Sequence, residues 1–358
     1  MTTPADSPGS PARSTGATIL LTMASLVVVC AGLSAAKDIV VPILAAVFVT
    51  AVALPPIVAL RSRGAPAWLA VTIVLLVVAA VLSLTGLVLA RTAASFGASF
   101  AEYRAALQLQ VSQAESWFGA RGIDISSQHL GDQLDPSRLL SLVKGLLAGA
   151  IGVLRDGAFV MALAGFLLAE AAGLPAKIKA AFDVSDETLG PWRHILDDMT
   201  GYLVVKTKTS LLTAVLVMIA LWLLGVDYVV ALGLLAFILN FVPVVGSIIA
   251  AVPAVLLALI AHGPWWALLV TGVYTAINVS IGSVLEPRMM GERLGLSALV
   301  VFLSLVFWGF LLGPVGMFLS VPLTMLAKIL LNNADDLRWL AIMLGPAPKP
   351  APDRGSAR

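Results

Sequence analysis

Long apolar stretches alternate with polar ones along the chain, and the gaps between charged side chains predict where helices cross a membrane. Residues 14–36, 39–60 and 64–90 contain no Lys, Arg, Asp or Glu. About 20 apolar residues in a helix span the hydrocarbon core of a bilayer, so each stretch is long enough to cross once. The pattern predicts three transmembrane helices within residues 18–91, preceded by a disordered cytoplasmic tail at residues 1–17.

The first sizeable polar segment covers residues 92–145, where charged and amide side chains recur every few residues. Apolar side chains within it follow a spacing of three or four positions: Phe96, Phe100, Tyr103, Leu107, Val111, Ala114 and Phe118. This spacing places them on one face of a helix, so we expect an amphipathic helix outside the hydrocarbon. Its apolar face packs either on the rest of the protein or a neighbouring subunit, or on the lipid surface.

A fourth transmembrane helix is predicted at residues 146–172, with Arg155 and Asp156 near its middle. Charges inside a span are costly and indicate function, unless the span starts later and the pair lies at the membrane interface. Residues 173–208 are polar again and are expected to form a helical segment on the opposite side. A fifth helix at about residues 201–225 leads into a C-terminal core at 209–333.

Two longer apolar stretches are each interrupted by proline and glycine. The 58 residues between Asp227 and Glu286, and the 34 between Arg293 and Lys328, contain no Lys, Arg, Asp or Glu. Interruptions at residues 240–246 and 313–316 leave arms shorter than a full span of about 20 residues. We therefore predict two broken helical hairpins, at residues 228–261 and 297–331, in an all-α polytopic membrane protein with about seven to eight membrane segments.

The hairpin turns supply the candidate substrate path. Irregular backbone at membrane depth is tolerated where protein buries it or where it lines a watery cavity, and transporters place binding sites at such interrupted segments. The alternative is that the prolines only kink or connect ordinary spans. The candidate path residues are Asn240, Pro243, Gly246, Asn278, Glu286, Pro287, Gly313, Pro314 and Gly316.

Basic residues predict the orientation, because short cytoplasmic loops carry an excess of Lys and Arg. A cytoplasmic N-terminus places residues 92–145 outside and residues 173–208 inside, and it returns the tail at 334–358 to the cytoplasm. The basic residues that this arrangement keeps inside include Arg61, Arg63, Arg288, Arg293, Lys328 and Arg338. Glu286 is then expected near water at the cytoplasmic end of its helix, paired with Arg288 or Arg293.

Composition excludes several classes of protein. The chain is 59% hydrophobic and 12% charged, with a mean hydropathy of +1.00, which leaves too little polar surface for a soluble enzyme. The net charge of +2 includes no basic cluster, so nucleic acid is not an expected partner. No phosphate-binding loop, catalytic triad or metal-binding motif is present, so no cofactor, metal or enzymatic activity is expected. The single cysteine, Cys30, cannot form an intramolecular disulfide.

An ordered set of short segments in this chain resembles the AI-2E transporter family, the PerM-like exporters. The similarity covers nearly the whole chain and is strongest from Gly201 onward. Each segment alone is a weak signal, and the ordered set is specific. The segments are residues 224–228, 232–236, 240–246, 285–291, 299–305, 313–316, 321–322 and 335–340.

The resemblance implies a bacterial inner-membrane protein that forms homo-oligomers, with a pentamer as the expected number of subunits. It also implies export of small molecules, with the quorum-sensing signal autoinducer-2 as the namesake substrate, while some relatives are assigned sodium/proton antiport. The family pattern has a glutamine and an acidic residue shortly before the proline of residues 285–291. This chain has Asn278 and Ile281 there, which counts against cation coordination or a proton relay at that point.

Three functional hypotheses follow. The first is a secondary exporter of small polar molecules of the autoinducer-2 type, which works by alternating access around the two hairpins, with the lipid bilayer and the substrate as partners. The second is a sodium/proton antiporter, whose coupling groups would be Arg155, Asp156, Asp227 or Glu286. The third is a membrane scaffold without transport activity, for which the amphipathic helix is the supporting feature.

Overall fold

The computed structural model describes residues 15–121, 136–155, 157–171, 177, 186–290, 296–332 and 338–345. Within these ranges all regular secondary structure is helical, and seven helices are long and apolar enough to cross a membrane. The fold is therefore an all-α polytopic one, as the pattern of charge gaps predicts. The seven candidate spans are Lys37–Ser62, Ala67–Ala98, Leu140–Glu170, Asp198–Leu223, Val245–His262, Pro264–Met290 and Ala298–Phe318.

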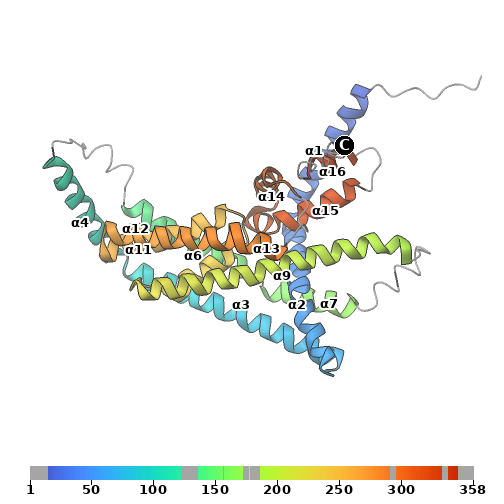
Figure 1. Ribbon diagram of the computed structural model, residues 1–358, viewed down its shortest axis with the longest axis horizontal. Coiled ribbons are helices and arrows are strands. Elements are labelled where there is room, and N and C mark those ends of the chain that lie inside the picture. The colour runs from blue at the N-terminus through green and yellow to red at the C-terminus, as the bar shows by residue number, and fades with distance from the viewer. Residues whose placement is uncertain are drawn as a thin grey trace, which may run out of the picture.

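The helices are named in chain order in Figure 1. The first half contains α1 (Thr15–Ala35), α2 (Lys37–Ser62), α3 (Ala67–Ala98), α4 (Phe100–Gly119), α6 (Pro136–Arg155) and α7 (Gly157–Ala171). The second half contains α9 (Asp186–Leu223), α10 (Val229–Leu239), α11 (Val245–His262), α12 (Pro264–Val279), the π-helix η1 (Ser280–Leu285), α13 (Glu286–Met290), α14 (Ala298–Phe318), α15 (Ser320–Asn332) and α16 (Arg338–Met343).

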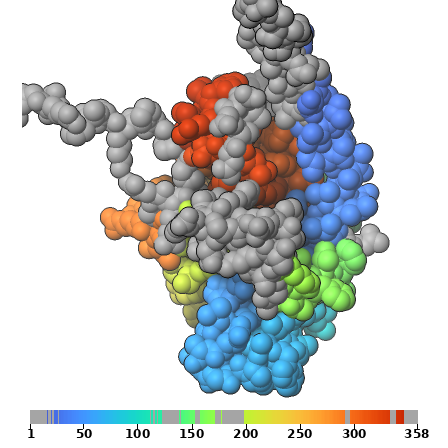
Figure 2. Space-filling view, turned by 90° about the vertical axis from the view of Figure 1, so that its right-hand side faces the viewer, coloured from blue at the N-terminus to red at the C-terminus, as the bar shows by residue number. Residues whose placement is uncertain are grey.

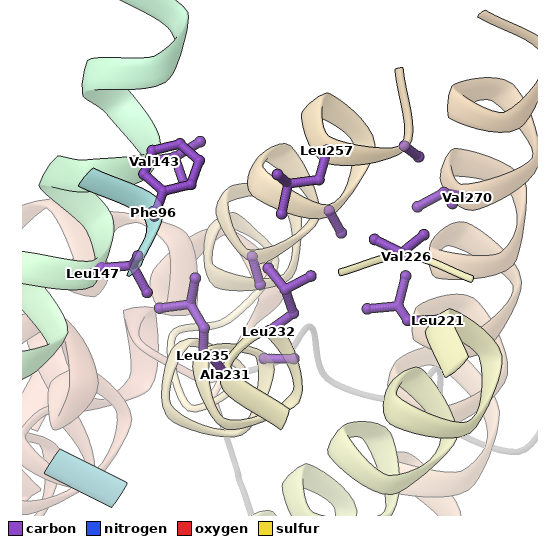
Figure 3. Close-up of a cluster of buried hydrophobic side chains, with 14 of the residues drawn as sticks. Phe96, Val143, Leu147, Leu221, Val226, Ala231, Leu232, Leu235, Leu257 and Val270 are labelled. Carbon is purple, nitrogen blue, oxygen red and sulfur yellow. The ribbon is translucent and has the colours of Figure 1, made fainter. Parts of the chain in front are cut away.

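The larger hydrophobic core joins helices from both halves of the chain. Figure 3 shows Phe96 of α3 and Val143 of α6 on one side of α10, and Leu221 of α9 and Val270 of α12 on the other. Of the seven candidate spans, α11 and α9 are the most buried: 44% and 39% of an 18-residue apolar stretch in each lies inside the protein. Lipid tails are as apolar as these side chains, so close packing contacts rather than release of water hold such a bundle together. α10 lies at the centre of this bundle, with α9 and α11 packed directly against it.

A second group of helices packs at one end of this bundle. α2 crosses α9 at a steep angle, and α14, α15 and α16 lie close to α1 and the upper part of α2 (Figure 1). Ile57 of α2, Val74 of α3 and Leu168 of α7 share a smaller buried cluster, and Figure 2 shows the α2–α3 turn next to α7 at this end. α1 contributes a shorter apolar stretch, Met23–Ala35.

The predicted amphipathic stripe is divided between two helices. α3 continues through Phe96 and ends at Ala98, and α4 begins at Phe100 after a turn at Ser99. Phe96 and Leu107 are buried in the larger core, with Phe100 and Tyr103 packed against it. In this part of the stripe the apolar face packs on the rest of the protein, which was the first of the two alternatives. One continuous helix from Phe96 to Phe118 was wrong, because the chain turns at Ser99.

A pair of tyrosines holds α4 against the second half of the chain. The Tyr103 hydroxyl donates to the Tyr228 hydroxyl at 3.4 Å, and the Phe96 ring stacks on Tyr103 with 5.4 Å between centroids. Burial, and then the hydrogen bond to Tyr228, raises the pKa of Tyr103 above its ordinary value. Tyr103 therefore keeps its proton, and this hydrogen bond, to a higher pH than an ordinary tyrosine does.

Two predicted boundaries differ from the structure. The polar residues before 201 and the helix expected at 201–225 belong to one helix, α9, which runs over 38 residues from Asp186. The fourth span contains α6 and α7, with Asp156 between them outside the described residues. The first difference arises because a polar stretch can remain helical, so a change of composition marks where a helix leaves the apolar layer rather than where it ends.

Candidate functional site

The first hairpin turn forms one wall of a cleft. α10 ends at Leu239, α11 begins at Val245, and Val244 between them has φ 61° and ψ −59°. The Val245 amide donates to the Pro243 carbonyl at 2.6 Å, which closes a γ-turn around Val244. Positive φ is strained for a β-branched residue, and such strain is concentrated at functional sites. Val244 is also 72% exposed, so apolar burial does not explain its conformation.

Gly246 allows the two arms of this hairpin to approach each other closely. A Cβ at Gly246 would lie 1.8 Å from the Leu239 carbonyl oxygen and 3.0 Å from Cβ of Val242. Any side chain would therefore push the end of α10 away from the start of α11. Gly246 is buried beneath the turn and fixes its shape rather than lining the cleft.

Asn240 connects this turn to α9 and α11. Its amide nitrogen donates to Ser210 Oγ at 2.9 Å, and its amide oxygen accepts from Ser247 Oγ at 3.2 Å. Asn240 is 8% exposed and Ser210 is fully buried, so the bond between them lies inside the protein, while the bond from Ser247 is partly buried. A buried polar group left unpaired costs about 1–3 kcal/mol, and these bonds fix the orientation of the amide.

A second wall of the cleft is a helix that changes type as it approaches Glu286. The α-helical turns of α12 end at Val279, and a π-helix, η1, carries the chain from Ser280 to Leu285. π-helical turns are rare and occur frequently at functional sites. The amide nitrogen of Asn278, just before η1, donates to the carbonyl of Tyr274 at 2.8 Å. The wider turns of η1 lead directly to Glu286, the first residue of α13.

Glu286 forms a buried ion pair with Lys206 of α9. The Lys206 ammonium donates to both carboxylate oxygens, at 2.9 and 3.0 Å, and the two side chains are 6% and 16% exposed. Glu286 was expected to pair with Arg288 or Arg293; its carboxylate pairs with Lys206 instead, and Arg293 lies outside the described residues. Helix packing explains the difference, because α9 lies against both η1 and α13.

The cleft between these walls has a volume of about 480 Å³ and is lined mainly by neutral polar and apolar side chains. Among its lining residues, Tyr274 is 3% exposed, and its buried hydroxyl has no hydrogen-bond partner in the described part of the chain. The lining residues are Lys206, Thr213, Asn240, Pro243, Val244, Ser247, Ile248, Ala251, Thr271, Tyr274, Thr275, Asn278, Val279, Gly282, Ser283 and Glu286.

The second hairpin turn lies beside the first but outside the cleft. Gly313 has φ 69° and breaks α14, and a Cβ at Gly316 would lie 2.1 Å from the Trp308 carbonyl oxygen. Phe318, just after this turn, stacks on Phe241 of the first turn with 4.4 Å between ring centroids. The structure thus brings the two turns together through aromatic rings, while the candidate path residues Gly313, Pro314 and Gly316 do not line the cleft.

The structure places the other sequence-predicted residues as follows. Asp227 is exposed beyond the end of α9, and Pro287 is exposed next to Glu286; neither lines the cleft. Arg155 is the last residue of α6, and Asp156 lies outside the described residues. Of the predicted path residues, Asn240, Pro243, Asn278 and Glu286 line the cleft. No group of three or more His, Cys, Asp or Glu able to hold a metal ion occurs in the described part of the chain.

Sequence reasoning missed the contribution of α9. Lys206 was assigned to the polar segment and not to the path, although it is followed by buried Thr209, Ser210 and Thr213 at a spacing of three to four residues. That spacing forms a polar stripe on one face of an otherwise apolar helix, which is the signal that could have identified it. Tyr274 gave no comparable signal, because a single tyrosine in an apolar stretch is ordinary.

The fold and the cleft define a class of protein. A polytopic helical membrane protein with a cleft that contains polar side chains beside a broken hairpin has the architecture of a membrane transporter. The sequence model of the AI-2E family transporter matches residues 22–336, and the chain belongs to this family.

Similar proteins support the same class. The chain is 36% identical over 332 residues to "Putative transport protein YhhT" of Escherichia coli (strain K12), which covers 93% of this chain and 95% of that protein. It is 34% identical over 329 residues to "AI-2 transport protein TqsA" of the same strain, covering 92% and 96%. A Haemophilus influenzae protein with the same general name as the first is 37% identical over 336 residues, covering 91% and 95%. The protein is a multi-pass membrane transporter.

Proposed function

We propose that this transporter exports small, uncharged polar molecules of the autoinducer-2 type and that they pass through the cleft between α9, the first hairpin and α12–η1. The observation that carries the proposal is the lining of the cleft, where Asn240, Asn278 and several hydroxyl groups surround a volume of about 480 Å³. Such a site suits a ligand that is recognised by hydrogen bonds rather than by charge. The similarity to a protein named for autoinducer-2 transport supports this substrate class.

The strained first turn and η1 are the elements that favour alternating access. Both depart from regular α-helical geometry, and each contributes a lining residue to the cleft, Val244 from the turn and Gly282 from η1. A small change of backbone angles at either element would widen or narrow the cleft, as in transporters with discontinuous helices. Because Phe241 stacks on Phe318, a movement of the first turn would also displace the second turn. The second hairpin would then move together with the first during the transport cycle.

The proposal includes an inner-membrane location with both termini in the cytoplasm and assembly into a homo-oligomer, with a pentamer as the expected form. The distribution of basic residues supports this orientation. Many large apolar side chains are exposed on the isolated chain, including Phe310 at 86% and Phe166 at 74%, and lipid or further subunits would cover them.

A cysteine-block experiment tests the path. Thr275 lines the cleft, is exposed and uses its hydroxyl only on the Thr271 carbonyl of its own helix, so Thr275→Cys should fold normally. In a Cys30→Ser background, a bulky thiol reagent at residue 275 should lower efflux of autoinducer-2 from loaded proteoliposomes about tenfold or more.

The matched control is Ser83→Cys, because Ser83 lines a separate apolar cleft between α3, α6 and α7. Labelling there should leave efflux unchanged. Undiminished efflux after complete labelling at residue 275, or an equal loss after labelling at residue 83, would contradict the proposed path.

Sodium/proton antiport is the second candidate, and one observation favours it: the carboxylate of Glu286 lies at the cleft. An antiporter would use this group to bind and release the coupled ion. We expect instead that sodium addition to vesicles carrying the protein produces no proton movement, since the Glu286 carboxylate is already paired with the Lys206 ammonium. A sodium-dependent signal that Glu286→Gln abolishes and Asp227→Asn retains would favour antiport.

A further inference from the structure

The charged side chains at the cleft neutralise each other. In the described part of the chain, Lys206 and Glu286 are the only charged residues that line it, and they pair at 2.9 and 3.0 Å. Lys208, two residues further along α9, is exposed and does not line the cleft. Arg288 is likewise exposed beyond Glu286. The cleft therefore contains one positive and one negative group and has no net charge.

We propose that the Lys206–Glu286 ion pair sets the charge selectivity of the cleft, admitting uncharged molecules and rejecting both anions and cations. The inference rests on the proposed function, since it concerns the molecules that pass through the same cleft. It assigns a specificity-determining role to two residues 80 positions apart.

Pairing makes each partner unavailable to a charged ligand. An anion that bound Lys206 would have to displace the Glu286 carboxylate, which would then be left without a counter-charge on a side chain that is 16% exposed. A cation that bound Glu286 would displace Lys206 in the same way. Buried charges without a partner are strongly unfavourable, so either ligand loses as much as it gains. A neutral ligand leaves the pair intact.

The neutral groups of the cleft supply what an uncharged ligand needs. The Tyr274 hydroxyl is buried without a partner in the described part of the chain, so it does not itself meet a ligand in the cleft. Thr271 and Thr275 donate their hydroxyl protons to carbonyls of α12 at 2.8 Å, which leaves their oxygens free to accept. The ligand class is thus an uncharged molecule with several hydroxyl or carbonyl groups.

Three matched probes test the charge selectivity: D-sorbitol, D-gluconate and 1-amino-1-deoxy-D-sorbitol, which share a six-carbon polyol chain and differ at one end in charge. Each is released from proteoliposomes that carry the full-length protein at pH 7.5. Wild type should release sorbitol about tenfold faster than either ion. Glu286→Gln, which leaves Lys206 as the remaining charge, should raise gluconate release about tenfold, and Lys206→Gln should raise release of the amine similarly.

Two further kinds of variant test whether the charges in the cleft, rather than a loss of folding, set the order of release. The exchanged pair Lys206→Glu/Glu286→Lys should restore the wild-type order, and Lys208→Gln should not alter it. If the single variants fail to fold, Thr275→Lys and Thr275→Glu add one charge to the cleft while the pair remains. These should favour gluconate and the amine respectively.

Equal release of the three probes by wild type, or an unchanged order of release in all charge variants, would overturn the proposal. The cysteine block at residue 275 separates this failure from failure of the proposed function. A block of efflux combined with unchanged charge preference rejects the selectivity inference alone, whereas absence of a block rejects the path itself.

Discussion

At the scale of single residues, the Lys206–Glu286 pair makes a large and testable contribution to stability. Lys206→Gln leaves a carboxylate with little solvent and no partner, so the free energy of unfolding should fall by about 3–5 kcal/mol. Lys208→Gln, at an exposed position on the same helix, should change it by less than about 0.5 kcal/mol. Chemical unfolding of the purified protein in detergent measures both changes. Similar losses for the two variants would show that the ion pair does not stabilise the fold.

Gly246 is the second residue at which we expect a substitution to lower stability, because the turn leaves no room for a side chain. Gly246→Ala places a Cβ 1.8 Å from the Leu239 carbonyl oxygen, and relief requires movement of backbone, so we expect a loss of about 2–3 kcal/mol and of efflux. Gly272→Ala on α12 is the control, because nothing lies within 4 Å of its added Cβ. That variant should be as stable as wild type or slightly more so, as alanine favours helices. Full efflux by Gly246→Ala would mean that the hairpin tolerates a wider turn.

The sequence predicted cleft residues on the first hairpin turn and on α12 and α13, and it missed the contribution of α9 for a physical reason. Asn240 and Pro243 interrupt an apolar stretch, and an interruption is visible within a short window of sequence. Lys206 is identified only by its partner, which is far away in the chain and comes close only when α9 packs against α13. Sequence patterns reveal local breaks, whereas pairing across helices depends on tertiary packing.

At the scale of elements, the turn between α10 and α11 stores strain that a substitution can release. Val244→Gly should change the free energy of unfolding by less than about 1 kcal/mol, because relief of the positive φ offsets the added freedom of the unfolded chain. Val245→Gly, at the first residue of α11, has no strain to relieve and should cost about 1 kcal/mol. Thermal unfolding in detergent compares the two, and an equal loss would argue against strain at Val244.

The helices themselves were largely predictable, and their ends were not. Gaps between charges located most of the apolar spans, since a charged residue in lipid is costly whatever its neighbours are. α9 was shortened in the prediction because its polar N-terminal part was taken as a separate segment. η1 was not predicted, because a π-helical turn differs from an α-helical one in hydrogen bonding and not in composition.

At the scale of the whole molecule, the proposed orientation gives a direct labelling test. Ser112 on α4 and Trp339 on α16 are both exposed, and the positive-inside distribution puts them on opposite sides of the membrane. In a Cys30→Ser background, an impermeant thiol reagent should label Ser112→Cys in intact cells and label Trp339→Cys only after permeabilisation. The reverse result would invert the topology.

The distance along the chain between Lys206 and Glu286 also orders events during synthesis. At about 5–20 residues per second, the 80 residues that separate them take about 4–16 s to make, so α9 is complete before its counter-charge exists. Lys206 lies eight residues inside the apolar stretch that begins at Asp198, or about 12 Å at 1.5 Å per residue, within reach of the interface for a long, flexible side chain. A nascent chain that stops before α13 thus carries Lys206 without its counter-charge, and the ion pair forms only after α13 has been made.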